Sequence, residues 1–216
     1  IILSGVTVNF DAYAGNGFIV SLLMRYFELS ISQASIYAGF VVGITGLLSL
    51  TLGASIADKL HQRPQGSRRL QFGALCLLLA APLVYCALRQ DNNAVTAFAV
   101  LFGLGWLLYY NYYTCVYPAM QDVVAPSLRG TAMALYFAGM YLLGGALGPL
   151  GVGALSDYLA KKAMLAQNAA ELLPIHKAQG LHDAMFLIPL MLALTAVMVF
   201  MASRSFAADA ARMKPA

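Results

Sequence analysis

The sequence predicts an all-α membrane protein with six transmembrane helices arranged as a 3+3 inverted repeat. Three observations predict this fold: the apolar composition, the positions of the charged residues and a short phrase that occurs twice. Apolar residues make up 61% of the 216 residues and charged residues only 10%, whereas about a quarter of the residues of a soluble domain are charged. No amphipathic helix remains to cover so large a core, which argues against a soluble helical protein.

The charged residues lie at the ends of long apolar runs or between them, with Asp11 as the exception. About 20 apolar residues in a helix cross a hydrocarbon core of about 30 Å, so each run is long enough for one crossing. Helices are expected because backbone groups in lipid have to be hydrogen-bonded within their own segment. We expect residues 1–216 to form one bundle whose spans are 1–24, 33–57, 70–89, 94–121, 129–157 and 184–203.

The first span is interrupted by polar residues, Asn9, Asp11 and Asn16. It has no basic flank, so it does not resemble a cleaved signal peptide. The chain starts on Ile1 rather than on Met. We therefore expect a fragment that opens at the edge of a helix.

The second and fifth spans end in similar phrases, GASIADKL at 53–60 and GALSDYL at 153–159. Both spans also carry glycines on one face, where neighbouring helices can approach closely. Because the two phrases end on opposite sides of the membrane, they indicate an inverted repeat of three helices each. The glycines expected to pack helices together are Gly43, Gly144, Gly148 and Gly151.

The third span contains two of the three cysteines, Cys76 and Cys86, and the fourth contains Cys115. Their spacing does not fit a metal site, and we expect membrane-buried thiols. The sequence has no P-loop, no G-x-S-x-G and no H-E-x-x-H. We therefore expect no metal, no cofactor and no enzymatic activity.

The fourth span concentrates aromatic residues in the stretch GWLLYYNYYTCVYP at 105–118. An aromatic belt at the membrane surface is one interpretation, but the middle of the span is too deep for it. The alternative is a substrate cavity, in which rings pack on the ligand and hydroxyls reach polar groups. The residues expected to line this cavity, together with the polar residues of the first span, are Asn9, Tyr13, Asn16, Trp106, Tyr109, Tyr110 and Tyr113.

Asp11 is the candidate for ion coupling. A carboxylate at the bilayer centre costs about 2.5–3.5 kcal/mol on insertion scales, so it is expected to face the bundle interior and to have a function there. Desolvation disfavours the charged form of a carboxyl group, which favours exchange of a proton. The alternative is a structural aspartate that is hydrogen-bonded to Asn9, Asn16 or neighbouring backbone.

The segment between the fifth and sixth spans, residues 158–183, has spaced apolar residues and Pro174 near its end. A short interfacial helix is expected here, ended by Pro174.

Eight of the 13 Lys and Arg residues fall on one side of the membrane, which places the start of the first helix and the C-terminus in the cytoplasm. These basic residues argue for contact with membrane lipid and against binding of nucleic acid. The eight are Lys59, Arg63, Arg68, Arg69, Arg129, Arg204, Arg212 and Lys214.

Residues 53–59, followed by basic residues at Arg63, Arg68 and Arg69, resemble the loop motif G-x-x-x-D-[RK] of the major facilitator superfamily. The motif glycine is displaced by one position, since Ala54 stands four residues before Asp58. The stretches Val124–Ala132 and Gly148–Asp157 resemble helices 10 and 11 of the Spinster branch. The resemblance implies that the chain is the C-terminal half of a twelve-helix carrier, and that the missing N-terminal half supplies helices 1–6.

The resemblance also implies a cytoplasmic gate that closes the outward-open state, formed by Asp58, Arg68, Arg69, Asp122 and Arg129. It implies alternating-access transport of an amphipathic or lipid-like solute, in a multi-pass protein of the bacterial inner membrane. Three alternatives stay open: a carrier of a small organic anion or sugar, a membrane enzyme or scaffold that transports nothing, and a carrier assembled from two copies of this chain.

Overall fold

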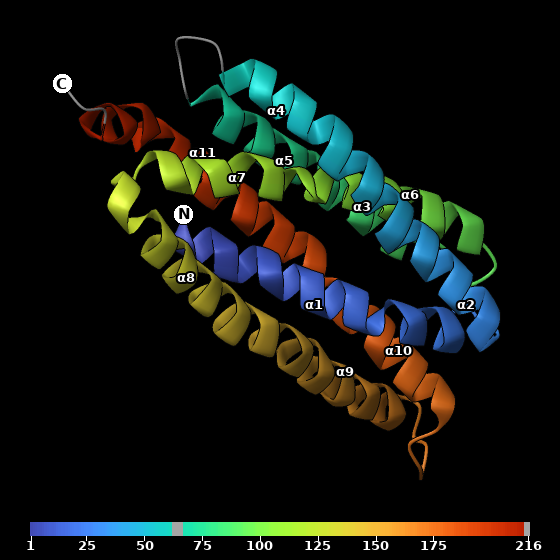
Figure 1. The fold of residues 1–216 in the computed structure, drawn as a ribbon. Coiled ribbons are helices and arrows are strands. Elements are labelled where there is room, and N and C mark those ends of the chain that lie inside the picture. The colour runs from blue at the N-terminus through green and yellow to red at the C-terminus, as the bar shows by residue number, and fades with distance from the viewer. Residues whose placement is uncertain (62–66, 214–216) are drawn as a thin grey trace.

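The computed structural model describes residues 1–61 and 67–213, and every regular element in this part of the chain is helical. Arg63 and Lys214, which contribute to the predicted charge bias, lie outside the described residues. The all-α class that the sequence predicts is confirmed (Figure 1). The helices are α1 (Ile2–Arg25), α2 (Ile31–Ala38), α3 (Thr45–Leu48), α4 (Ala54–His61), α5 (Arg68–Leu88), α6 (Val95–Tyr109), α7 (Asn111–Asp122), α8 (Arg129–Gly139), α9 (Ala146–Ala166), α10 (Pro174–Ala184) and α11 (Leu187–Arg212).

Five stretches of the described chain are long and apolar enough to cross a membrane: 31–60, 68–88, 95–122, 126–166 and 174–212. The helix α1 is 24 residues long and is not among the five. It also runs through the bundle, with Asn9, Asp11 and Asn16 along its middle. We number the six helical paths in chain order, so that α1 is the first path and the five stretches above are the second to the sixth.

Three of the paths are not regular α-helices. The second path contains π-helical segments at Gly39–Ile44 and Ser49–Gly53, and the fifth contains one at Met140–Gly145. The fourth path is interrupted between α6 and α7 at Tyr110. Wide turns of this kind inside helices are frequently found at functional sites.

The chain between α9 and α10 differs from the expectation. The fifth path continues as helix to Ala166, and Pro174 begins α10 instead of ending an interfacial helix. The sequence-based interpretation is wrong because proline is favourable in the first helical turn, where its missing N–H would have no partner in any case.

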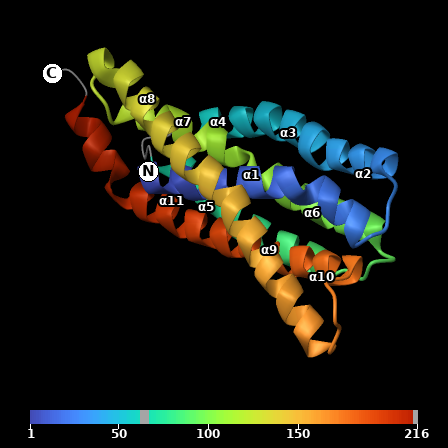
Figure 2. The ribbon, with the colours of Figure 1, turned by 90° about the horizontal axis from the view of Figure 1, so that it is seen from below.

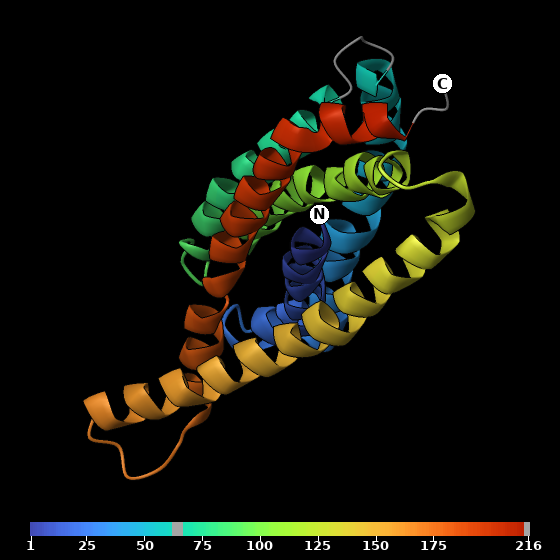
Figure 3. The ribbon, with the colours of Figure 1, turned by 90° about the vertical axis from the view of Figure 1, so that its left-hand side faces the viewer.

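The helix α1 lies at the centre of the bundle, with the α8–α9 path on one side and α5, α7 and α11 on the other (Figures 1 and 3). A column of aromatic rings on α6 packs within this core, with neighbouring ring centroids 4.6 to 5.2 Å apart. The start of α1 and the end of α11 lie toward the same end of the bundle, which we call the terminal end. The column comprises Phe98, Phe102, Trp106 and Tyr109, with Phe27 beside its first ring.

Glycines allow the fifth path to approach the backbone of α1. A Cβ added to Gly144 would collide with the carbonyl oxygen of Val6, and one added to Gly148 would lie 2.6 Å from the carbonyl oxygen of Phe10. At Gly151 the nearest atom would be in the Phe10 ring, 3.2 Å away. The packing expected at these three glycines is therefore present. At Gly43 an added Cβ would meet nothing within 4 Å, so the packing expected there is not found among the described residues.

We expect Gly148→Ala to destabilise the bundle by about 1–3 kcal/mol, the usual cost of forcing extra volume into a packed site. The Cβ would have to displace a backbone carbonyl, which cannot rotate away. Thermal unfolding of the detergent-solubilised protein measures the effect. Gly130→Ala is the matched control, because a Cβ at Gly130 meets open space; equal melting temperatures for the two variants would contradict the prediction.

Candidate functional site

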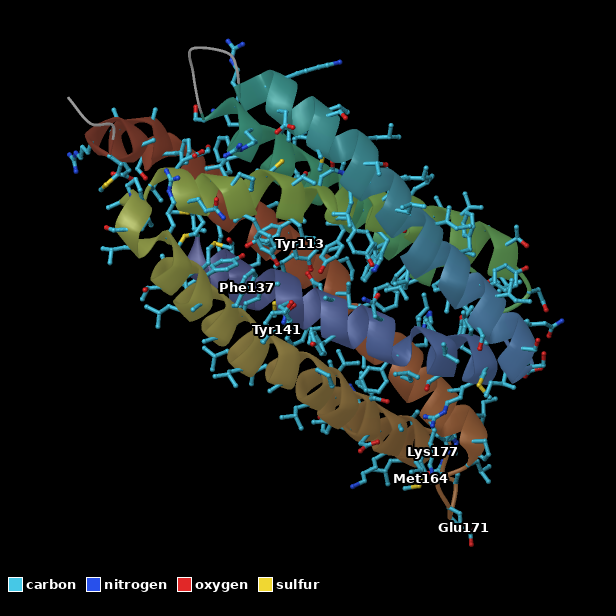
Figure 4. All side chains as sticks on the ribbon, in the orientation of Figure 1. Tyr113, Phe137, Tyr141, Met164, Glu171 and Lys177 are labelled. Atoms are coloured by element: carbon cyan, nitrogen blue, oxygen red, sulfur yellow. The ribbon has the colours of Figure 1, made fainter. Side chains whose placement is uncertain are left out.

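One face of α1 forms a wall of a cavity of about 530 Å³. The residues Asn9, Ala12, Tyr13, Asn16 and Gly17 line it, and their spacing of three and four residues places them on one side of the helix. The remaining lining residues are Tyr113 from α7 and Met140 and Tyr141 from the π-helical segment of the fifth path. Figure 4 shows Tyr113 on the α7 side of α1, and Phe137 and Tyr141 on the α8 side.

Two amide side chains of α1 connect the cavity wall to its neighbours. The Nδ2 group of Asn9 donates a hydrogen bond to the carbonyl oxygen of Met140 at 2.9 Å. The indole Nε1–H of Trp106 donates to Oδ1 of Asn16 at 3.0 Å. These bonds fix the cavity face of α1 relative to the fifth path and to α6.

The tyrosines of the fourth path occupy different environments. Tyr113 lines the cavity, and its hydroxyl is 2.7 Å from that of Tyr109. Tyr109 is fully buried behind it and donates to the carbonyl oxygen of Val8 at 3.0 Å. Tyr110 is not among the lining residues. Its ring packs on the second path, 3.2 Å from the position of a Cβ on Gly46, and its side chain also hydrogen-bonds to Asn16 and Trp106. The structure therefore places Tyr113 on the cavity wall but not Tyr109 or Tyr110.

Trp106 is also fully buried and reaches the cavity only through Asn16. A second hydroxyl network lies nearer the start of α1, where the Tyr112 hydroxyl is 2.7 Å from that of Tyr136 and 3.0 Å from that of Ser4.

Tyr141 and Met140 were not predicted as lining residues. Tyr141 is an aromatic residue in the middle of the fifth apolar run, and this position was the feature of the sequence that could have identified it. Its ring contacts that of Tyr13 at a centroid distance of 6.3 Å.

Asp11 lies behind the cavity wall. It is fully buried, and neither carboxylate oxygen has a hydrogen-bond partner among the described residues. It shares a face of α1 with Val8, which accepts from Tyr109, and with Gly15, which packs against the Trp106 ring. The alternative of a structural aspartate bonded to Asn9 or Asn16 does not match this geometry.

Charged residues gather at the terminal end. Arg69 on α5 donates to Asp122 on α7 at 2.7 Å, with the arginine side chain only 4% exposed and the aspartate 32%. Arg129 donates through Nε to the carbonyl oxygen of Gln121 at 3.0 Å, in the last turn of α7, where a cation is favourable. Asp58 is exposed at the end of α4, and Arg68 is half-buried at the start of α5.

Among the described residues, no three His, Cys, Asp or Glu side chains form a group able to hold a metal ion. The described cysteines are free thiols, with Cys76 and Cys115 buried and Cys86 exposed. The side chains that line the cavity offer hydrogen bonding and aromatic packing.

Comparison with known proteins identifies related sequences. A family model described as Major Facilitator Superfamily matches residues 1–149. Protein spinster homolog 3 of Danio rerio is 29% identical over 123 residues, which cover 57% of this chain and 24% of that protein. Protein spinster homolog 1 of Homo sapiens is 29% identical over 131 residues, covering 60% and 24%. An MFS-type efflux pump of Mycolicibacterium smegmatis is 27% identical over 163 residues, covering 74% and 36%.

The fold matches a solved structure described as the crystal structure of a bacterial homolog to the human lysosomal transporter Spinster, in an inward-facing and occupied conformation. The TM-score is 0.80 at 21% identity, and the match covers 96% of this chain and 49% of that one. The chain thus spans about half of that structure and 24% to 36% of the curated relatives named above. The predicted resemblance to the Spinster branch is confirmed. The efflux pump is described by its transport activity, and the solved structure is described as a homolog of a transporter.

We expect Asp122→Ala to cost about 1–3 kcal/mol of stability, because it leaves the buried Arg69 guanidinium without its acceptor. The partial exposure of Asp122 places the effect toward the lower part of this range. Thermal unfolding in detergent measures the loss. Asp58→Ala is the control, since an exposed carboxylate contributes little, and an equal loss in both variants would disprove the importance of the Arg69–Asp122 pair.

Proposed function

This chain belongs to the Major Facilitator Superfamily, and we propose that it forms the C-terminal half of an alternating-access secondary transporter whose solute is amphipathic or lipid-like. Membership of the superfamily and the coverage of half of a Spinster-like structure support a carrier completed by a second six-helix half. The location that follows from this proposal is the inner membrane of a bacterium, with the terminal end in the cytoplasm.

The single observation that supports the solute class best is the composition of the cavity on α1. Amide groups of Asn9 and Asn16 alternate along it with the rings of Tyr13, Tyr113 and Tyr141. Rings bind an apolar body, and hydroxyl and amide groups bind a polar head. An amphipathic molecule satisfies both parts of such a surface.

A carrier of small organic anions is less well supported by the same cavity. None of the described residues that line it is a lysine or arginine, so a carboxylate or phosphate would find no cationic partner among these lining residues. The anionic head group of a lipid-like solute would then be bound by the other half of the carrier, or by the hydroxyl and amide groups that line this cavity.

We further propose that Asp11 carries the coupling proton. Its complete burial and the absence of a hydrogen-bond partner among the described residues favour the neutral, protonated carboxyl in this conformation. The Tyr109 hydroxyl, which lies on the same side of α1, is 2.7 Å from the Tyr113 hydroxyl on the cavity wall. A change in the packing of α1 against α6 would connect the carboxyl to the cavity through these two hydroxyls.

We expect Tyr13→Ala to reduce transport of a lysophospholipid about two- to tenfold, since an aromatic contact is worth about 0.5–1.5 kcal/mol beyond the area it buries. The assay measures uptake of the labelled lipid into proteoliposomes that contain the whole protein. Tyr158→Ala, which removes an exposed tyrosine of α9, is the control. If both variants transport at the wild-type rate, the cavity on α1 is not the path of this lipid.

We expect Asp11→Asn to abolish accumulation driven by a pH gradient and to leave downhill exchange largely intact, because asparagine keeps the shape of the side chain but does not exchange a proton. Transport by the whole protein is measured in proteoliposomes with and without the gradient. Asp157→Asn, at an exposed position, is the matched control. Wild-type accumulation by Asp11→Asn at every pH would remove Asp11 from the mechanism but would leave the solute class open.

A further inference from the structure

The helices α5 and α11 run side by side (Figure 2), on the side of α1 away from the fifth path (Figure 3). They are antiparallel, so that α5 begins and α11 ends at the terminal end. A groove of about 260 Å³ lies between them. None of the residues that line this groove also lines the cavity on α1. The groove is therefore a separate site, outside the proposed path of the solute.

The shape of the groove follows from the sizes of its side chains. Two alanines form the floor, Ala74 with 4% and Ala196 with 3% of its surface exposed. Because each helix places only a methyl group here, a hollow remains between the larger side chains on either side. These larger side chains are apolar and 44% to 54% exposed, and they form the walls: Leu75 and Leu78 of α5, and Val197 and Phe200 of α11.

The groove ends close to two basic residues at the membrane surface. Its lining residues on α5 extend from Gln71 to Leu78, about 10 Å along the helix axis. Arg68 is the first residue of α5, one turn before the groove begins. Arg204 stands one turn beyond the last lining residue of α11. The hydrocarbon core is about 30 Å thick, so the groove fits the part of an acyl chain nearest to its head group.

The guanidinium of Arg204 is held at the mouth of the groove. Its Cζ lies 5.2 Å from the centroid of the Phe200 ring, within the range of a cation–π contact. This contact places the positive charge beside the wall that Phe200 forms. A guanidinium binds phosphate oxygens through parallel hydrogen bonds, and the Arg204 side chain is exposed, so its donors can reach a head group.

The carboxylates near this end of the groove belong to other contacts. Asp122 is bound to Arg69, on the neighbouring helix α7. Asp209 lies about 140° around α11 from Arg204, where it lines a different cavity with residues from the start of α1. Arg204 forms no ion pair within the part of the chain that the structure describes. Its charge is therefore complementary to an anion at the membrane surface.

We propose that the groove between α5 and α11 binds an acyl chain of an anionic phospholipid from the leaflet at the terminal end, with the lipid phosphate on Arg204. Gln71 is exposed at the same end of the groove, and its amide can donate to an ester oxygen of the lipid. An anionic head group fits better than a zwitterionic one, because the guanidinium repels an ammonium group.

This lipid is a bound partner of the protein and not its transported solute. Its two parts touch both helices, the acyl chain through the walls of the groove and the phosphate through α11. Binding to the folded protein alone stabilises it in proportion to the occupancy of the site. The bound lipid thus reinforces the packing of the third path against the sixth.

The test compares two lipids with identical acyl chains, phosphatidylglycerol and phosphatidylcholine, bound to the whole protein in detergent. Native mass spectrometry measures the dissociation constant of the first lipid bound. We expect the wild type to prefer phosphatidylglycerol. Arg204→Gln should bind it about fivefold more weakly, the usual effect of one basic residue near an anionic lipid, and should bind phosphatidylcholine as the wild type does.

Arg89→Gln is the matched control, because it removes an exposed arginine directly after the opposite end of α5. It should keep the wild-type preference for phosphatidylglycerol. Equal binding of the two lipids by the wild type, or an equal loss of preference in both arginine variants, would overturn the proposal.

A second pair of variants tests the groove itself. Phe200→Ala removes one wall together with the ring beneath the guanidinium, and should weaken binding of phosphatidylglycerol. Met201→Ala removes an exposed apolar side chain that does not line the groove, and should not weaken it. Glycerol 3-phosphate, which has no acyl chain, should bind far more weakly than the lipid. Equal affinities for the two would show a site for phosphate alone and refute a lipid groove.

Tyr13→Ala separates this site from the cavity on α1. It should bind phosphatidylglycerol as the wild type does, whatever its effect on transport. If Tyr13→Ala loses the bound lipid and Arg204→Gln retains it, the lipid occupies the cavity on α1 and the groove proposal is wrong.

Discussion

The arrangement of the bundle depends on the contact between the backbone of α1 and the glycines of the fifth path. Carbonyl oxygens of Val6 and Phe10 lie where side chains would stand at Gly144 and Gly148. Only this close approach allows Asn9 to reach the carbonyl oxygen of Met140, and it brings Tyr13 against Tyr141. The cavity wall is thus a consequence of two positions that have no side chain.

Most of the polar groups on α1 have partners, which limits the cost of placing them in a membrane-spanning bundle. Asn9 and Asn16 are bonded to the two neighbouring paths, and Ser4 to Tyr112. Asp11 differs from them because its carboxyl oxygens have no partner among the described residues. A buried polar group without a partner costs free energy that the fold has to offset, so its retention fits a role that appears in another conformation of the protein.

The apolar runs predict the all-helical class, because the length of a crossing is set by the thickness of the bilayer. The sequence also indicated the cavity face of α1, because Asn9, Tyr13 and Asn16 interrupt an apolar helix at helical spacing. All three line the cavity. The sequence did not distinguish Tyr113 from its neighbours. Tyrosines at successive positions point in all directions around a helix, and the interruption at Tyr110 changes the direction of those that follow. The position of Met140 on the cavity wall depends on a contact between distant segments, for which a single sequence gives no signal.

The π-helical segments affect which face of the second and fifth paths points toward the bundle. Buried residues recur every fourth position in the fifth path, at Tyr136, Met140, Gly144, Gly148 and Val152. The second path has the same period, at Val41, Thr45, Ser49, Gly53 and Ala57. An α-helix has 3.6 residues per turn, so a spacing of four drifts by about 40° at every step and by about 120° after three.

A π-helical turn holds more residues than an α-helical turn, so it compensates for part of this angular drift. The remaining drift gives the path a right-handed supercoil around its neighbour. The π-helical segments therefore keep one face of each long path directed at the bundle along its whole length. The same period occurs in the two paths that the inverted repeat relates, and both contain π-helical turns, two in the second path and one in the fifth. The likeness of the two paths is thus visible in the spacing of their buried residues, even where their amino-acid sequences differ.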